Sequence, residues 1–456
     1  MILSFMEWLT SFFVIALAAI CWRRDVRWVL FFLLIYSVLY FLPSVVPLLD
    51  GTQAGDIARL RFSGSSNFMK IQAILVLAFS GYALYRCAWP IVLRSWCVRV
   101  GLMGGLLLAG LILEVGVVSR LQLQNVLSVF LMCTLGSLGA DAWERAQVSG
   151  WRDEVFARMA VLLLLMLFGS VVLAYVEILY DKAWSRYMAS NGYVIIRASA
   201  MMFNPNLYAM WCSVLAIGFA FFWQARVLIG RDTWLLLGVY LAGLGVFLSS
   251  ARSLACLLLL FFVGTAAMLP HGHGRRWLPS FVYVLSLFSA TAVSVLAWRL
   301  GGGDSAAHHF VLLGERLMAA PIQLVAVLMD QIAPGSLWEG QAVRPEAILA
   351  FEGRFQGEGR DSGFLTAYDD AGVLGLFAMV VFWGSLSYFG VKAFWRRQDI
   401  HTIYALGLVG YGLVVGVIMR YQVFPVWVFL AVMLAPCLAL WRTVLPKVAF
   451  GFPVWL

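Results

Sequence analysis

Four arginines of this chain lie where a charged side chain is costly, at the ends of long apolar segments or in the long polar segment that leads into one. They are Arg197, Arg252, Arg360 and Arg420. Burying a charge at membrane depth costs free energy, so such residues tend to face a cavity and to serve a function. A guanidinium group presents a fixed fork of donors that fits the oxygens of a phosphate. The pattern therefore indicates binding of a phosphate-bearing ligand.

Arg252 follows Ser249, Ser250 and Ala251 in a turn between two apolar segments. The turn is too short to carry the guanidinium far from the membrane surface, and small hydroxyl residues beside it suit a phosphate pocket. We count Arg252 as a catalytic candidate and Ser250 as a substrate-binding one. The alternative is an interfacial arginine that reaches toward lipid headgroups.

Arg197 precedes the segment Asn204-Pro205-Asn206, which predicts the start of a helix. Asparagine suits the helix cap and proline the first turn. The amino-terminal end of such a helix favours an anion. A plain helix start would explain the proline and asparagines without explaining Arg197, so we count Arg197 and Asn206 as substrate-binding candidates.

A third cluster, at the end of a long polar segment, contains Glu358, Arg360 and Asp361 and is followed closely by Tyr368 and Asp369. A catalytic acid/base pair and a salt-bridged loop would have the same composition. We take Glu358, Arg360 and Asp361 as catalytic candidates and leave that alternative open.

Three further sets of polar residues complete the candidates. Arg420 and Tyr421 form a very short connection, which equally suits an interface anchor. Adjacent residues point in different directions in regular structure, so at most one of His308 and His309 is a candidate base. The spacing of possible ligands predicts no metal site. Glu177, at the end of an apolar segment, stays unassigned because it could simply pair with an arginine.

The elements that must position these residues are apolar blocks. Hydrophobic residues make up 63% of the 456 residues and charged residues 12%, against roughly 25% charged in soluble domains. Blocks of about twenty apolar residues separated by short charged clusters predict an all-α polytopic membrane protein with about thirteen spans. The predicted spans are 3–21, 28–48, 71–88, 100–118, 123–140, 157–177, 206–223, 233–249, 251–269, 278–298, 372–391, 403–419 and 423–441.

The connections between these spans alternate in basic content, which predicts their sidedness. Lys and Arg concentrate in cytoplasmic connections, so the denser set should be cytoplasmic and the amino terminus outside. The denser set contains Arg23, Arg24, Arg27, Arg86, Arg94, Arg99, Arg145, Arg152, Arg158, Arg226, Arg231, Arg275, Arg276, Lys392, Arg396, Arg397, Arg442 and Lys447. The phosphate-binding candidates then share the opposite face.

Three parts follow from this arrangement: spans with short loops over 1–298, a large outer loop over 299–371 with interfacial helices, and three spans with a cytoplasmic tail over 372–456.

The net charge of +9 does not predict nucleic-acid binding, because the arginines recur at helix ends and form no basic stripe. The seven cysteines contain no CxxC pair and lie in or beside apolar blocks, which favours buried thiols over disulfides or zinc.

Several motifs resemble the O-antigen ligase and O-antigen polymerase superfamily. Arg197 with Phe203-Asn204-Pro205-Asn206 resembles its Arg…Phe-x-x-Pro-Asn segment, and Phe247 to Ser253 resembles its Ser-Arg turn, with Ala251 inserted before the arginine. The large loop ends in Asp361-Ser362-Gly363-Phe364-Leu365 and then Ala371 to Leu376, as in that family. The resemblance covers about Arg197 to Arg420.

The resemblance implies a metal-independent glycosyltransferase without a cofactor in the inner membrane of a bacterium, acting on the periplasmic side. Its substrates would be undecaprenyl-diphosphate-linked glycans, and its partners membrane lipid, a chain-length regulator and a flippase. Ligases usually carry a histidine where this chain has Arg360, Asp361 and Ser362, which favours a repeat-unit polymerase. His308 or His309 could replace that histidine, so a ligase that transfers polymer to lipid A core is the alternative, and a lipid-linked glycan flippase a further one.

Overall fold

A computed structural model describes the helical centre of the chain and part of its carboxy-terminal region. The described residues are 154–179, 185–188, 194–200, 202, 205–226, 230–270, 275–300, 363–396 and 398–418, with isolated positions at 9–20, 106 and 109. The helices are α9 (Glu154–Leu179), α10 (Pro205–Gln224), α11 (Asp232–Leu248), α12 (Arg252–Met268), α13 (Leu278–Leu300), α18 (Gly363–Arg396) and α19 (Ile400–Ile418).

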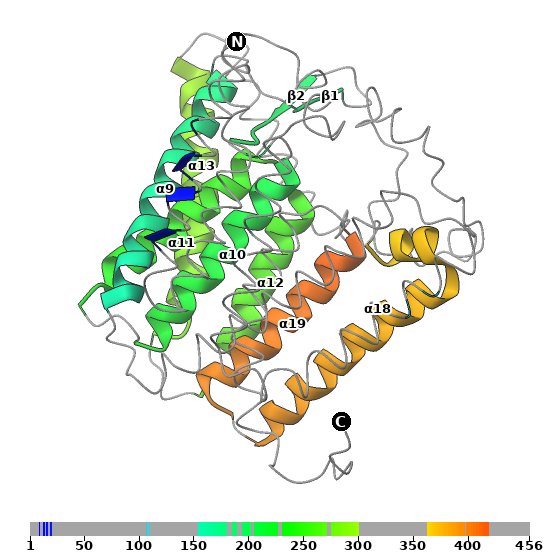
Figure 1. Cartoon of the computed structure of the whole chain (residues 1–456). Helices are drawn as coiled ribbons and strands as arrows, with labels where there is room; N and C mark the ends of the chain where they lie inside the picture. Colours follow the sequence, from blue (N-terminus) through cyan, green and yellow to red (C-terminus); the bar gives the residue numbers. More distant parts are fainter. Residues whose placement is uncertain are drawn as a thin grey trace.

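These helices coincide with seven of the predicted apolar segments, from 157–177 through 278–298 and then 372–391 and 403–419. The other predicted spans lie outside the described residues. One boundary differs clearly: α18 begins at Gly363, inside the segment expected to end the large loop. Its first turns run at an angle to the rest of the helix (Figure 1), so part of the loop's polar end is helical.

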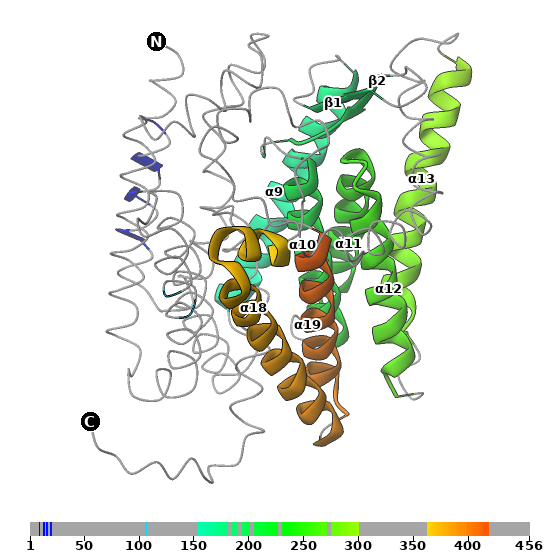
Figure 2. The same cartoon turned by 90° about the vertical axis from the view of Figure 1, so that its right-hand side faces the viewer.

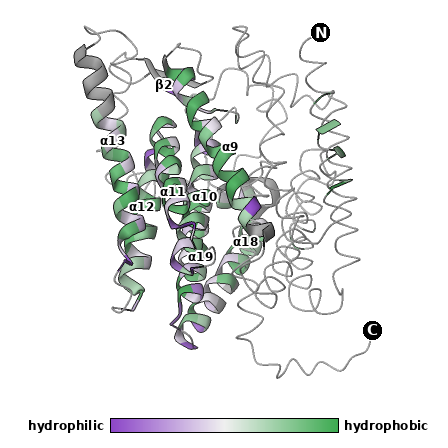
Figure 3. Ribbon diagram, turned by 90° about the vertical axis from the view of Figure 1, so that its left-hand side faces the viewer, coloured by the Kyte–Doolittle hydropathy of each residue, from purple (hydrophilic) through white to green (hydrophobic). Residues whose placement is uncertain are grey.

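Four described helical segments are long and apolar enough to cross a membrane: Ala157–Ile178, Pro205–Gln224, Val373–Arg396 and Ile400–Val417. Shorter apolar segments occur in α11, α12 and α13. Figure 3 shows this apolar character along most of the length of the helices. A helix of 17 residues, such as α11 or α12, is about 26 Å long at 1.5 Å per residue, slightly less than the hydrocarbon core of a bilayer.

Helix α10 forms the centre of the bundle. It packs against α9, α11, α12 and α19, and nearly all its side chains are buried, including Tyr208, Trp211 and Cys212. Helix α9, by contrast, exposes Leu165 and Phe168, as expected for a face turned toward lipid. Asn206, the candidate residue on α10, is therefore held by an inner helix rather than a peripheral one.

Glycines bring α10 and α11 into close contact. A Cβ atom at Gly245 would lie 2.5 Å from the Cys212 sulfur and 3.0 Å from the Tyr208 hydroxyl oxygen. A Cβ atom at Gly238 would lie 2.5 Å from the ring of Phe219. Small residues at helix contacts allow backbones in a membrane bundle to approach closely, and here they fix α11 against the inner helix.

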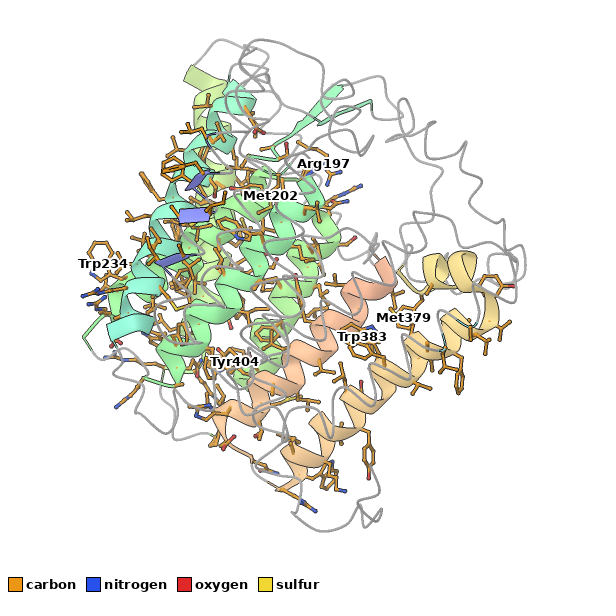
Figure 4. All side chains as sticks on the ribbon, in the orientation of Figure 1. Arg197, Met202, Trp234, Met379, Trp383 and Tyr404 are labelled. Carbon is orange, nitrogen blue, oxygen red and sulfur yellow. The ribbon has the colours of Figure 1, made fainter. Side chains whose placement is uncertain are left out.

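Helix α19 connects the bundle to α18. It packs against α12 and α18, and Figure 1 shows it lying between them. Trp383 and Met379 of α18 are buried, and Figure 4 shows both in the region where α18 approaches α19. Tyr404 of α19 makes edge contacts with Phe221 and Phe261. Aromatic packing thus joins the carboxy-terminal helices to α10 and α12.

The described residues are almost entirely helical, as predicted, but they also include a hairpin that the sequence analysis missed. Strands β1 (Ser185–Met188) and β2 (Val194–Arg197) pair antiparallel, with Ser185 opposite Arg197. The hairpin lies where α9 ends and α10 begins (Figure 2). We call this end of the bundle the hairpin end. The all-α prediction was therefore wrong for this segment, which forms two strands. Arg197 is the last residue of β2 and lies next to the bundle.

The opposite end of the bundle is basic, and we call it the basic end. Helices α11 and α13 start there and α18 finishes there, each with an exposed tryptophan: Trp234, Trp277 and Trp395. Tryptophan and basic residues concentrate at membrane interfaces. The described basic residues at this end are Arg158, Arg226, Arg231, Arg275, Arg276, Lys392 and Arg396. This distribution follows the alternation predicted from the sequence.

Candidate functional site

Arg197 ties three separate elements together at the hairpin end. Its Nε–H donates a hydrogen bond to the Ser249 carbonyl oxygen at 3.0 Å, and an Nη2–H donates to the Asn206 Oδ1 at 2.6 Å. Arg197 ends β2, Ser249 follows α11, and Asn206 is the second residue of α10. Figure 4 shows Arg197 at this end of the molecule. The guanidinium is therefore held in a defined orientation by residues far apart in the sequence.

The turn between α11 and α12 brings Ser250 and Arg252 to the same place. Ser250 has φ 53°, a left-handed conformation that non-glycine residues rarely adopt and that often marks functional sites. The Ser249 hydroxyl donates to the Val246 carbonyl at 2.7 Å and accepts from the Ala251 N–H at 3.3 Å. Arg252 is half-buried and is the first residue of α12. This short turn places Arg252 three residues from the carbonyl that Arg197 contacts.

The segment after Arg197 turns inward and closes the end of the bundle. Ala198, Ser199 and Ala200 are almost completely buried. The Ala198 N–H donates to the Leu248 carbonyl at 3.1 Å, and Ala200 has φ 48°. Helix α10 then begins at Pro205, which confirms the predicted helix start. The segment and the α11–α12 turn thus lie side by side.

Glu177 is the residue of this region to which the sequence analysis assigned no role. It lies in the last turn of α9 with only 2% of its surface exposed, and its Oε2 accepts a hydrogen bond from the Ser199 N–H at 2.8 Å. Its second oxygen, Oε1, has no hydrogen-bond partner among the described residues. The hydroxyl oxygens of Ser199 and Ser250 are also buried without such partners there. In the sequence, Glu177 could have been recognised as a candidate because it is a carboxyl group at the end of an otherwise apolar segment.

The structure therefore brings together four of the predicted site residues, Arg197, Asn206, Ser250 and Arg252, around one end of the bundle. The other candidates lie outside the described residues: His308, His309, Glu358, Arg360, Asp361, Arg420 and Tyr421. Within the described ranges, no group of three His, Cys, Asp or Glu side chains could hold a metal ion.

Two arginines and several hydroxyl groups at the end of an apolar bundle can bind a phosphate group while its hydrophobic substituent stays in lipid. Arginine binds phosphate through directed, charge-assisted hydrogen bonds. Such bonds are stronger in a partly dry site than in water, because the local dielectric constant is lower. The carboxyl group of Glu177, held by a backbone N–H, adds a group that can take up or release a proton.

The fold and this polar end define the class of the protein as a membrane-embedded bundle of helices with a polar cluster at one end. No family model matches the chain, and neither does any curated protein nor any solved structure.

Proposed function

We propose that this protein is a glycosyltransferase of the bacterial inner membrane that polymerises undecaprenyl-diphosphate-linked oligosaccharide repeat units on the periplasmic side. The product would be a surface polysaccharide such as O-antigen, capsule or exopolysaccharide. One observation carries the proposal: Arg197 contacts both Asn206 and Ser249. The two segments that resemble the O-antigen polymerase superfamily, each unremarkable alone, thus form a single cluster.

The proposed reaction needs no metal ion or nucleotide sugar. A hydroxyl group of one lipid-linked unit attacks the anomeric carbon of the growing glycan, and undecaprenyl diphosphate leaves. Negative charge develops on the leaving oxygen, and oriented donors stabilise such charge more than they stabilise the ground state. Arg197 is already oriented by Ser249 and Asn206, and Arg252 begins the helix beside it. We assign diphosphate binding to these two arginines.

The remaining candidates complete the proposed site from outside the described residues. Arg360 would add a cation to the diphosphate pocket, and Glu358 or Asp361 would act on the attacking hydroxyl group. Arg420 and Tyr421, and one of His308 and His309, would contact the substrate.

The sidedness supports this orientation. The basic end, with its exposed tryptophans and arginines, is expected to face the cytoplasm. The hairpin end then faces the periplasm. The undecaprenyl chain would enter between helices from the bilayer and leave its diphosphate at the level of Arg197 and Arg252. Partners implied by this role are a flippase that supplies the units and a regulator of chain length.

The experiment that tests this function is deletion of the gene in the source bacterium, followed by gel analysis of its surface glycan. A polymerase deletion leaves single repeat units on the normal acceptor, and re-expression of the wild-type protein restores the ladder of long chains. Long polymer retained on undecaprenyl diphosphate would instead identify a ligase. Loss of outward-facing lipid-linked units would identify a flippase. An unchanged glycan profile would contradict all three.

The same strain tests the assigned residues. Arg252→Ala should fail to restore long chains although the protein reaches its normal level in the membrane, because a diphosphate-binding donor is lost. The matched control is Arg275→Ala, which removes an exposed arginine at the basic end and should restore long chains fully. Long polymer from the Arg252→Ala strain would contradict the assignment.

A further inference from the structure

Glu177 lies in an environment that is costly for a carboxyl group. Only 2% of its surface is exposed, and no basic side chain in the described part of the chain forms an ion pair with it. Burying a charged group without a paired charge is strongly unfavourable. An ionisable residue retained inside a membrane protein at such a cost is a candidate for a functional role.

The two oxygen atoms of this carboxyl group have different surroundings. Oε2 accepts the hydrogen bond from the Ser199 N–H at 2.8 Å, which fixes the orientation of the group. Oε1 is buried and has no partner among the described residues. Buried polar atoms in folded proteins nearly always have a partner, so each exception calls for an explanation. The Ala200 N–H also interacts with this carboxyl group, so two successive backbone N–H groups hold it in place.

Two hydroxyl groups in the same region share this property. The Ser199 and Ser250 hydroxyl oxygens are buried and also lack partners among the described residues. The Ala198 N–H bonds to the Leu248 carbonyl, and the Arg197 Nε–H bonds to the Ser249 carbonyl, so the two serine segments run beside each other. A hydroxyl group can donate and accept at once, but neither of these forms a hydrogen bond with Oε1 of Glu177 in this structure.

We propose that Glu177 accepts the proton of the attacking sugar hydroxyl group in the glycosyl transfer, and this inference rests on the proposed function. The hydroxyl oxygen forms the new bond to the anomeric carbon. The bond between that carbon and the diphosphate oxygen breaks, and its electron pair leaves with undecaprenyl diphosphate. The hydroxyl proton passes to the Glu177 carboxylate. Arg197, two residues before Ser199, stabilises the departing diphosphate at the same end of the bundle.

The test compares Glu177→Gln with the wild-type protein in the deletion strain. Glutamine keeps the size of the side chain and an oxygen that accepts the Ser199 N–H, but it cannot take up a proton. Because general base catalysis contributes about 100-fold or more, the Gln variant should restore less than about one hundredth of the long chains. Full restoration would overturn the proposal and leave Glu177 as a structural anchor.

A second pair of variants guards against a folding defect. The Asp and Asn side chains that replace Glu177 have the same length and shape, but only the Asp carboxylate can take up a proton. We expect the Asp variant to retain part of the activity and the Asn variant to lose it. Equal activity of the two would also overturn the proposal.

Binding of undecaprenyl diphosphate to purified variants separates this step from the diphosphate site. The Gln variant should bind this lipid as the wild-type protein does, because Glu177 is assigned to the hydroxyl proton and not to the diphosphate. Loss of binding in the Gln variant would overturn the inference. A failure of the proposed function itself is recognised separately, because the deletion strain would then keep its normal polymer.

Discussion

The two ends of the helical bundle use arginine in different ways. At the basic end, Arg231 is exposed and reaches the Ala157 carbonyl at 3.3 Å, while Arg276 donates to the Leu269 carbonyl at 2.7 Å and stacks over Trp277. At the hairpin end, Arg197 is half-buried and links the end of a strand, the start of α10 and the turn after α11. At the basic end Arg276 caps the end of α12 and Arg231 bonds to the first turn of α9, whereas Arg197 organises a buried polar cluster.

This difference shows that the surroundings of an arginine, more than its presence, indicate a functional site. Arginine side chains near helix ends commonly bond to terminal carbonyls or extend toward lipid headgroups. Left-handed residues occur at both ends, since Arg226 at the basic end has φ 51°. At the hairpin end the left-handed residues, Ala200 and Ser250, are buried, and they accompany the buried carboxyl group of Glu177.

The largest expected effect on polymer yield comes from replacing Arg197 at the hairpin end, compared with replacing an arginine at the basic end. Arg197→Ala should reduce polymer formation about 100-fold or more, because removing one oriented donor to a developing anion has an effect of that size. Arg197→Lys should rescue little, since an ammonium group cannot reproduce the two directed bonds to Ser249 and Asn206. Glycan gels of the complemented deletion strain, with immunoblots for protein level, provide the measurement.

Arg231→Ala is the control for this exchange, because it removes an exposed arginine at the basic end. It should change polymer yield less than twofold, in keeping with the small value of exposed charges. Equal losses from Arg197→Ala and Arg231→Ala would remove the distinction between the two ends.

The sequence was sufficient for the helices because their signal is local. Each described helix coincides with a block of apolar residues, and Pro205 marks the start of α10 as its chemistry predicts. The hairpin escaped prediction because its strands have only four residues each and lie in a mixed polar and aromatic segment. Strand formation depends on side-chain contacts with neighbouring strands, and runs of four residues are too short to predict them.

The arrangement of the site was harder to foresee for a related reason. Arg197 and Ser249 are separated by 52 positions, and their contact depends on how α10 and α11 pack. The contact between Glu177 and Ser199 depends on the path of residues 198–200, in which Ala200 adopts a conformation unusual for alanine. Composition indicated which residues were candidates, but only tertiary packing determines which of them meet.

An intermediate effect is expected where the packing of α10 and α11 supports the hairpin end. Gly245→Ala places a Cβ atom 2.5 Å from the Cys212 sulfur, and overpacking of this kind costs about 1–3 kcal/mol. The thermal midpoint of the purified protein in detergent should fall accordingly. Since the Gly245 carbonyl accepts the Ser249 N–H, polymer yield should fall as well.

Gly218→Ala on α10 is the matched control for Gly245→Ala, because its added Cβ has no atom within 4 Å beyond the local backbone of its own helix. It should leave the polymer yield near the wild-type value and should not lower the thermal midpoint, because a helix interior favours alanine over glycine. A wild-type thermal midpoint for Gly245→Ala would show that α10 and α11 pack less tightly around Gly245 than the structure shows.

The smallest effect concerns the left-handed backbone at the hairpin end. Ala200→Gly should raise the free energy of unfolding by about 0.5–1 kcal/mol, because glycine adopts a positive φ without steric cost. Ala198→Gly, two residues earlier and outside the positive-φ region, should give no gain. Thermal unfolding of the two variants compares them directly, and equal shifts would argue against strain at Ala200.

The most direct test of the central claim is the binding of undecaprenyl diphosphate to the purified, full-length protein. Native mass spectrometry in detergent can compare the wild-type protein with Arg252→Ala at the hairpin end and Arg275→Ala at the basic end. A diphosphate site at the hairpin end predicts at least about tenfold weaker binding for Arg252→Ala, given the strength of charge-assisted bonds, and unchanged binding for Arg275→Ala. Equal binding by all three proteins would contradict it.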